Sequence, residues 1–245
     1  MKRRSLISSA AALALLASPS SATTVLYDGT LRTAPDAQGW LYAMFPLRGA
    51  RATQSVEGVT TILDTTAAVR DMAGYFSTRL LPIAALDRAQ GFQLLFTLRI
   101  LEERHISPNR AGFSLIVLSS DLKGVELGFW QDQIWAQSDR PLFTRGEGSR
   151  PFNTWSQSVD YALTIHGLTY TLSADGTPIL SGALKDYSAF DTPPFDFVYR
   201  QPNFIFFGDN TGSAAARVAI GSIAIETSAT EPPMEAGNAE KGRTP

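Results

Sequence analysis

The chain has 245 residues, with 21 Lys and Arg against 23 Asp and Glu, so its formal net charge at pH 7 is −2. Apart from three basic residues at positions 2–4, this slightly acidic chain has no basic run, so it lacks the composition of a nucleic-acid-binding protein or of one held at an anionic membrane. It contains no cysteine, so disulfides are excluded and the fold must be stabilised by its hydrophobic core.

The N-terminus has the pattern of a secretory signal peptide. Three basic residues at positions 2–4 precede an apolar run over about 6–17, and small residues lead up to Ala22. The run is shorter than the ~20 residues that span a bilayer. We therefore expect a signal peptide over 1–22 and a secreted protein, extracellular or periplasmic, with an uncleaved N-terminal anchor as the alternative.

The C-terminal residues 228–245 are polar and rich in Pro, Glu and Gly, with one Met and no aromatic residue. Such a segment cannot bury enough apolar surface to offset its ordering entropy, so we expect a disordered tail. It offers no membrane span after signal cleavage. Residues 23–227 then form one domain, a size common for a single β domain.

Between these ends, short alternating segments predict strands. In the first half they cover 24–28, 39–45, a hairpin of 52–56 with 59–63, and 72–77. The clearest strand is 91–100, where every second residue is apolar and points to one face. These inward residues are Phe92, Leu94, Phe96, Leu98 and Ile100.

The second half begins with a hairpin over 111–137, whose two apolar runs flank a Ser-Ser-Asp-Leu-Lys-Gly turn. A strand over 159–167 follows, and Asp175-Gly176 predicts a tight turn between 170–174 and 178–181. Further strands are expected at 203–208 and 215–226, the latter with a β-bulge at Gly221-Ser222, where the alternation changes phase. Long loops are expected at 138–158 and 185–202. About a dozen short strands without an amphipathic helix predict an all-β sandwich or barrel.

The segments AGFSLIVLSSD, VELGFW, YTLSADGTPILSG and PNFIFFGDNT resemble the concanavalin A-like lectin/glucanase superfamily. They are most similar to secreted bacterial choice-of-anchor domains of the PEP-CTERM type, although the hydrophobic anchor of those proteins is missing. The resemblance covers about 25–227. It implies a two-sheet antiparallel jelly-roll sandwich with ligands, often glycans, on a concave face, but it does not fix one function.

The strand from Val125 to Asp132 has a second decorated face. Alternation places Glu126, Gly128 and Trp130 opposite the core-facing residues, and Trp135 and Gln137 continue this face across a turn. Flat indole rings beside amides and acids suit sugars, whose C–H face stacks on a ring. The predicted ligand-binding residues are Arg110, Glu126, Trp130, Trp135 and Gln137. The alternative is that both tryptophans pack under a loop and Glu126 forms a structural pair with Arg110 or Arg99.

A catalytic function is the second hypothesis, with Glu126 as one acid of a glycoside hydrolase or polysaccharide lyase. A glycosidase needs two carboxyl groups about 5–5.5 or 6.5–9.5 Å apart. At roughly 3.3 Å per residue, Glu126 and Asp132 would lie about 20 Å apart along one strand, so they are not that pair. A partner acid would have to come from another strand, such as Asp160 or Glu147.

No cofactor is required by the motifs of the sequence. A calcium site is the remaining chemical hypothesis. Asp28 ends the first predicted strand, and Asp209 begins a polar turn before the last one. If these strands are neighbours, their oxygen atoms would suit Ca²⁺; two ordinary Asx turns are the alternative.

We expect a secreted, non-catalytic jelly-roll module that binds a polysaccharide or glycan. A polysaccharide-degrading enzyme and an adhesion or matrix module without a small ligand are the alternatives.

Overall fold

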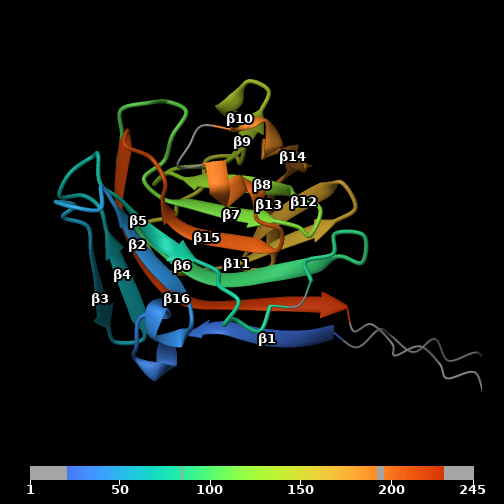
Figure 1. Ribbon diagram of the computed structural model, residues 1–245, viewed down its shortest axis with the longest axis horizontal. Coiled ribbons are helices and arrows are strands. Elements are labelled where there is room, and N and C mark those ends of the chain that lie inside the picture. The colour runs from blue at the N-terminus through green and yellow to red at the C-terminus, as the bar shows by residue number, and fades with distance from the viewer. Residues whose placement is uncertain (1–20, 84, 192–195, 229–245) are drawn as a thin grey trace, which may run out of the picture.

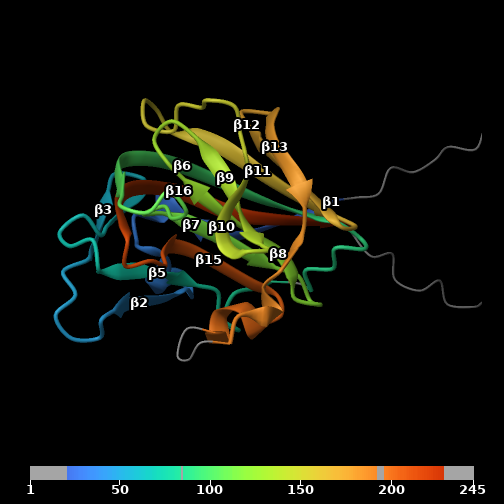
Figure 2. The ribbon, with the colours of Figure 1, turned by 90° about the horizontal axis from the view of Figure 1, so that it is seen from above.

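Alternating apolar side chains build two antiparallel sheets of eight strands each in the computed structural model, which describes residues 21–83, 85–191 and 196–228. The predicted signal peptide and disordered tail lie outside the described residues, except for Ser21 and Ala22 in the first strand and Ser228 in the last. The all-β sandwich expected from the sequence is confirmed. Figures 1 and 2 show the two sheets stacked face to face.

Sheet I is built around the longest strands of the described chain. Its order is β13 (Thr177–Ala183), β12 (Thr169–Ala174), β11 (Val159–His166), β6 (Phe92–His105), β16 (Ala214–Ser228), β4 (Thr60–Asp64) and β3 (Thr53–Glu57), and β1 (Ser21–Asp28) also pairs with β16. The first and last described strands are therefore neighbours, which is the condition on which the calcium hypothesis depended.

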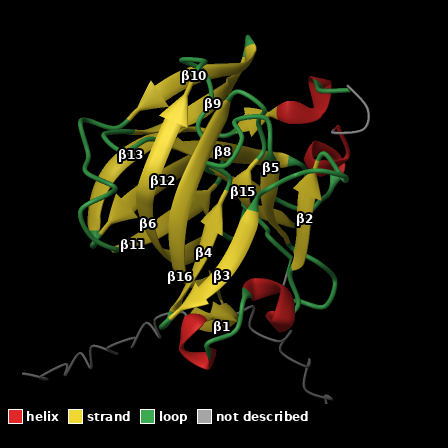
Figure 3. Cartoon of the chain, turned by 90° about the vertical axis from the view of Figure 1, so that its left-hand side faces the viewer, coloured by secondary structure: helices red, strands yellow, loops and turns green. Residues whose placement is uncertain are grey.

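Sheet II carries the predicted hairpin at its centre. Its order is β10 (Leu142–Gly148), β9 (Ile134–Asp139), β8 (Lys123–Phe129), β7 (Ser114–Leu118), β15 (Phe204–Asp209), β5 (Met72–Phe76) and β2 (Leu41–Phe45), and β14 (Lys185–Asp186) pairs with β8. Four short 3-10 helices among the described residues, η1 (Gly29–Leu31), η2 (Pro35–Gln38), η3 (Tyr187–Ala189) and η4 (Asp196–Arg200), lie at the periphery of the sandwich (Figure 3). In the described part of the chain, none of these helices is long and apolar enough to cross a membrane.

The main core lies between the sheets and follows the period of two. All five inward residues predicted for 91–100 are buried in it, from Phe92 to Ile100. The predicted bulge in β16 is also confirmed, since its register with β6 shifts between Ile220 and Ile223, and both isoleucines remain buried. A bulge lets two residues of one strand oppose one residue of the other, which returns the apolar side chains to the core.

The outer face of sheet II carries a second apolar cluster. Residues of β7 and β15 that point away from the main core pack there with two tyrosines from the segment after β13; the buried members are Ile116, Leu118, Tyr187, Tyr199, Phe204 and Phe206. The segment around η3 and η4 therefore covers part of this face. The sequence had predicted a loop here.

Two strands, β10 and the two-residue β14, fall in segments that were expected to be loops. Residues 138–158 were expected to be a loop, but β10 occupies Leu142–Gly148 at the edge of sheet II. Its sequence, LFTRGEG, does not alternate, and its register with β9 shifts twice. An edge strand with bulges does not need a regular apolar face, so the period of two gave no signal.

Gly74 of β5 is predicted to be intolerant of a side chain. A Cβ atom at this position would lie 2.5 Å from Cε2 of Phe206 and 2.7 Å from the carbonyl oxygen of Phe207. We expect Gly74→Ala to lower the free energy of unfolding by about 1–3 kcal/mol, because the neighbouring backbone cannot move away. Urea denaturation measures the change. Gly212→Ala is the matched control, since its nearest neighbour would lie 3.9 Å away; equal effects of both variants would contradict the prediction.

Candidate functional site

A pocket of about 620 Å³ opens on the outer face of sheet II. This volume lies within the range of ~300–1,000 Å³ that is typical of small-molecule sites. The strands β2, β5, β15 and β7 form its floor, because their residues alternate between the main core and this face. Phe206 and Ile116 point outward here, whereas the neighbouring Phe207 and Leu115 belong to the core.

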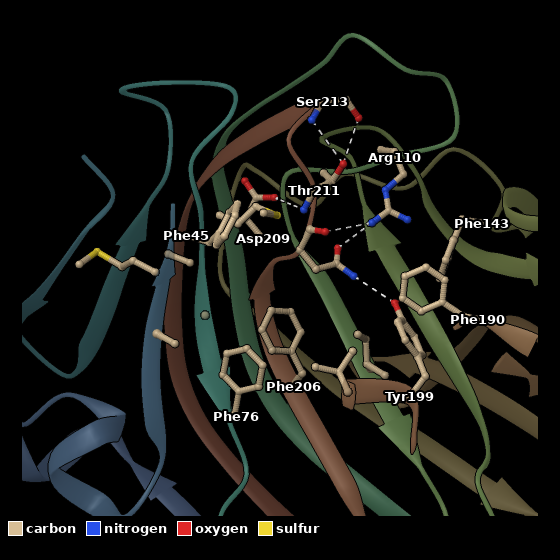
Figure 4. A pocket seen from close by; sticks show the side chains of 18 of the residues that line it. Phe45, Phe76, Arg110, Phe143, Phe190, Tyr199, Phe206, Asp209, Thr211 and Ser213 are labelled. Atoms are coloured by element: carbon tan, nitrogen blue, oxygen red, sulfur yellow. Dashed lines mark hydrogen bonds between the residues drawn. The ribbon is translucent and has the colours of Figure 1, made fainter. Parts of the chain in front are cut away.

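One wall of the pocket consists of aromatic rings from segments far apart in the sequence (Figure 4). Phe143 comes from β10, Phe190 follows η3, and Tyr199 lies in η4. Phe143 contacts Phe190 edge to face at 4.8 Å between ring centroids, and Tyr199 lies 5.4 Å from both rings. The three rings hold one another in place, so the wall is formed before any ligand enters.

Polar groups gather at one end of the pocket, from Arg110 and the turn after β15 (Figure 4). Nη2 of Arg110 donates to the side-chain oxygen of Asn210 at 3.1 Å and to its carbonyl oxygen at 3.3 Å. The hydroxyls of Thr211 and Ser213 share a hydrogen bond of 3.0 Å. The guanidinium of Arg110 also lies 5.4 Å from the centroid of Phe143, which connects the polar end to the aromatic wall.

Glu126 lies beneath this polar end and is fully buried. Its carboxylate accepts hydrogen bonds from the Tyr199 hydroxyl at 2.7 Å and from Nδ2 of Asn210 at 2.8 Å. Nη2 of Arg110 approaches it to 4.0 Å. Burial first, and then the charge of Glu126, raise the pKa of Tyr199 well above its usual range, so this phenol remains a donor. Glu126 therefore holds in place three groups that line the pocket.

Gln137 completes the support of Arg110. With its amide oxygen turned toward Arg110, it accepts from Nη1 at 2.7 Å, and its nitrogen donates to the carbonyl oxygen of Phe143 at 3.3 Å. The opposite orientation would place two donors face to face. Gln137 and Glu126 are both 1% exposed or less, so they position Arg110 rather than contact solvent.

Asp209 lines the pocket with a nearly buried carboxyl group. It accepts from the Thr65 hydroxyl at 2.8 Å and from the backbone N–H of Thr211 at 3.0 Å. Burial is the largest effect on this group and raises its pKa well above the usual range, although the two hydrogen bonds and Arg110 act in the opposite direction. The carboxyl group therefore keeps its proton at pH values where an ordinary Asp is ionised.

The two tryptophans of the predicted site lie next to the pocket's support rather than in the pocket. Trp130 is 8% exposed and Trp135 is fully buried. His105 stacks on the Trp130 ring at 4.1 Å, Arg145 lies over the ring at 4.8 Å, and the indole N–H donates to the carbonyl oxygen of Arg110 at 3.0 Å. No face of Trp135 is open to a ligand in this arrangement.

Of the five predicted ligand-binding residues, the structure thus brings all five into one neighbourhood, but only Arg110 lines the pocket. Tyr187 and Tyr199 pack over Glu126. The alternative stated from the sequence placed both tryptophans under a long loop and paired Glu126 with Arg110 or Arg99. In the structure the strands β6 and β10 cover Trp130 through His105 and Arg145. Of the two arginines, Arg110 approaches Glu126, to 4.0 Å.

Asp28 and Asp209 are not brought together. Asp28 lies opposite Ser222 in sheet I and caps η1 by accepting from Thr30, which lowers the pKa of its carboxyl group. Asp209 lies opposite Ala73 in sheet II. Among the described residues, no group of three or more His, Asp or Glu side chains could hold a metal ion. Each aspartate instead accepts from the backbone N–H two residues later, which is the hydrogen bond of an Asx turn. Two Asx turns were the alternative to the calcium site.

The aromatic wall and the apolar floor were not predicted as a site. Phe143, Phe190 and Tyr199 fall in stretches expected to be loops, and Phe76 and Phe206 alternate as ordinary strand residues. The signal that was available is the density of aromatic residues in 187–199, which is unusual for an exposed loop. The turn at 209–211, singled out for its oxygen atoms, does line the pocket.

Comparisons with known proteins place the chain by fold. No family profile matches it, and no curated protein matches it. A carbohydrate esterase from the Shiga toxin-encoding bacteriophage phi24B superposes with a TM-score of 0.57 and 15% identity over 85% of this chain and 100% of that chain. A sialidase superposes with a TM-score of 0.51 and 11% identity, over 84% of this chain and 18% of the sialidase chain. A Bacillus subtilis protein with a galectin-like fold superposes with a TM-score of 0.49 and 9% identity, over 84% of this chain and 98% of that chain.

At these identities the first two similarities show a shared β-sandwich fold and do not identify a ligand. The relationship to choice-of-anchor domains stays a prediction from the sequence.

Proposed function

We propose that this chain is a non-catalytic carbohydrate-binding module that takes its ligand in the pocket on the outer face of sheet II. The observation that carries the proposal is the composition of this one pocket. It joins a preformed wall of aromatic rings to a fixed set of guanidinium, amide and hydroxyl groups (Figure 4). The C–H face of a sugar packs against rings, and its hydroxyls need such polar partners.

The predicted binding residues keep roles in this proposal, but the roles differ. Arg110 is the residue that contacts the ligand, together with Asn210. Glu126 and Gln137 position the Arg110 guanidinium from below, and Trp130 holds the Arg110 backbone through its indole N–H. The fold similarity to proteins named as a carbohydrate esterase and a sialidase supports the class of ligand.

Phe190 of the aromatic wall is the residue that tests the proposal. It lines the pocket and packs on the outer cluster of sheet II rather than in the main core, and we expect Phe190→Ala to weaken glycan binding roughly tenfold through the lost ring contact. Titration calorimetry against a panel of oligosaccharides measures this. Thermal unfolding checks that the variant folds. Trp155→Ala is the control, since Trp155 is 51% exposed and does not line the pocket.

Two results would contradict carbohydrate binding at this site. The first is a soluble, folded protein that binds no glycan of a broad polysaccharide and oligosaccharide panel, which would favour an adhesion or matrix module. The second is glycan binding that Trp155→Ala weakens and Phe190→Ala leaves unchanged, which would place the site elsewhere on the surface.

A polysaccharide-degrading enzyme is the second candidate, and the raised pKa of Asp209 favours it. A carboxyl group that keeps its proton near neutral pH has the property of a general acid. However, Asp209 is the one carboxylic acid among the described residues that line the pocket, and Glu126 lies beneath it with its oxygens occupied. Glycoside hydrolysis ordinarily uses two carboxyl groups, so we propose binding without catalysis. Release of reducing ends that Asp209→Asn abolishes would establish the enzyme.

The proposal includes secretion of the protein. The basic and apolar pattern of residues 1–22 supports it. Cell fractionation, with N-terminal sequencing of the mature protein, tests this part separately; a mature chain that begins at Thr23 is expected, and an intact Met1 in the cytoplasmic fraction would contradict it.

A further inference from the structure

The pocket separates its polar and apolar lining into two ends. The side-chain polar atoms of the lining come from Arg110, Tyr199 and the turn at 209–213, and Figure 4 shows them together at one end. Phe76 and Phe206 lie at the other end, and Phe45, which pairs with Met72 in the register of β2 and β5, lies near Asp209. The lining over β2 and β5, together with Phe206, carries no nitrogen or oxygen in its side chains and is called the apolar end. Its residues are Ala43, Met44, Phe45, Leu47, Met72, Gly74, Phe76 and Phe206.

The backbone beneath the apolar end has little to offer a polar ligand. Gly74 of β5 lies opposite Ala43 of β2 on one side and Gly208 of β15 on the other, so its strand is paired along both edges. A hydroxyl placed at this end would lose its hydrogen bonds to water without replacement. A ligand with hydroxyls on every edge therefore fits the polar end and does not fit the apolar end.

The mouth of the apolar end is exposed and apolar. Leu47 is 87% exposed, Phe45 40% and Met44 37%, and all three line the pocket. A contiguous group of exposed apolar side chains beside a pocket is typical of a surface that an apolar ligand group covers. The apolar end thus extends outward past the floor of the sheet.

We propose that the ligand is an amphiphilic carbohydrate. Its sugar binds at the polar end, beside Arg110 and Asn210, and an alkyl or acyl substituent on that sugar fills the apolar end between Phe45, Phe76 and Phe206. This inference rests on the proposed function, because it assigns the sugar to the same site and adds the substituent.

The experiment is a titration with n-alkyl β-D-glucosides and n-alkyl β-D-galactosides from methyl to octyl, below their micelle concentrations. Each methylene buried in the pocket should tighten binding about fourfold until the apolar end is full. The matched n-alkan-1-ols should bind more weakly than the glycosides, since they lack the sugar.

Two different failures separate the inference from the proposed function. If the affinity is independent of chain length while unsubstituted sugars bind, the proposal of an amphiphilic ligand is wrong, and the proposal of carbohydrate binding is unaffected. If alcohols bind as tightly as glycosides of the same length, the sugar contributes nothing, and both proposals fall.

Two leucines of nearly equal exposure give a matched pair of variants. Leu47→Ser should weaken binding of the octyl glycoside several times more than binding of the methyl glycoside, because the longer chain contacts more of the apolar end. Leu80→Ser should change neither, since Leu80 is 83% exposed but does not line the pocket. Thermal unfolding checks that both variants fold. Equal effects of both substitutions on the octyl glycoside would overturn the assignment of the apolar end.

Discussion

Replacing Glu126 with alanine is expected to lower the free energy of unfolding by about 3–5 kcal/mol, the range found when one member of a buried charged pair is removed. Glu126 is fully buried and accepts from Tyr199 at 2.7 Å and Asn210 at 2.8 Å, with Arg110 at 4.0 Å. Without the carboxylate, two donors lose their acceptor, and a guanidinium that is 16% exposed loses the negative charge 4.0 Å away. Urea denaturation at pH 7 measures the loss.

An exposed acid provides the control. Glu57 lies 3.7 Å from Arg217, and their side chains are 57% and 42% exposed, so Glu57→Ala should cost less than about 1 kcal/mol. The double variant Arg110→Met, Glu126→Gln should cost less than the sum of the two single variants, because they share one network. A loss below about 1 kcal/mol for Glu126→Ala would show that the pocket stands without this network.

Substitution of Glu126 also tests the proposed glycan binding. Glu126 does not line the pocket, yet it fixes Tyr199, Asn210 and Arg110, all of which do. The conservative Glu126→Gln variant retains one acceptor oxygen and should fold better than Glu126→Ala. If Glu126 positions Arg110, glycan affinity should fall in Glu126→Gln even where the protein remains folded.

The sandwich could be predicted from the sequence because its signals are local. The alternation in β6, the phase change in β16 and the Asp175-Gly176 turn each depend on residues within one or two strands. Asp175 and Gly176 have φ of 47° and 78°, as a type I′ turn requires. Where the alternation fails, as in β10, the prediction failed as well.

The pocket could not be predicted because it depends on distant contacts. Tyr199 reaches Glu126 across 73 positions and Asn210 across 11. The sequence shows that Glu126 and Trp130 point away from the main core, but it does not show that the segment around η3 and η4 folds back over them. A side chain that points away from the main core can therefore still be buried by a segment that folds over it.

The stability of the protein is expected to fall as the pH rises above about 4, in part through Asp209. Burial raises the pKa of this carboxyl group well above its ordinary value of 3.8. Between that value and the raised pKa, the folded chain holds a proton that the unfolded chain has released. The free energy of unfolding therefore decreases with pH in this window, by up to about 1.4 kcal/mol per pH unit, and changes no further above the raised pKa.

Asp209→Asn isolates this contribution. An amide cannot ionise, but its oxygen can accept from the backbone N–H of Thr211, and its nitrogen can donate to the Thr65 hydroxyl, which also accepts from the Ala216 N–H. The variant should match the parent protein at pH 4 and exceed its stability increasingly toward pH 8. Urea denaturation at each pH unit measures the difference.

A second buried acid makes the comparison with the parent protein necessary. Burial also raises the pKa of Glu103, although His105 and the N–H of Gly112 lower it, so Glu103 adds a slope of the same sign. Both proteins contain Glu103, and the difference between them therefore reports Asp209. A stability difference that stays constant from pH 4 to 8 would mean that Asp209 ionises normally in the folded chain. The polar end of the pocket would then carry a negative charge beside Arg110, and a neutral sugar hydroxyl would meet an ion pair there instead of a neutral donor.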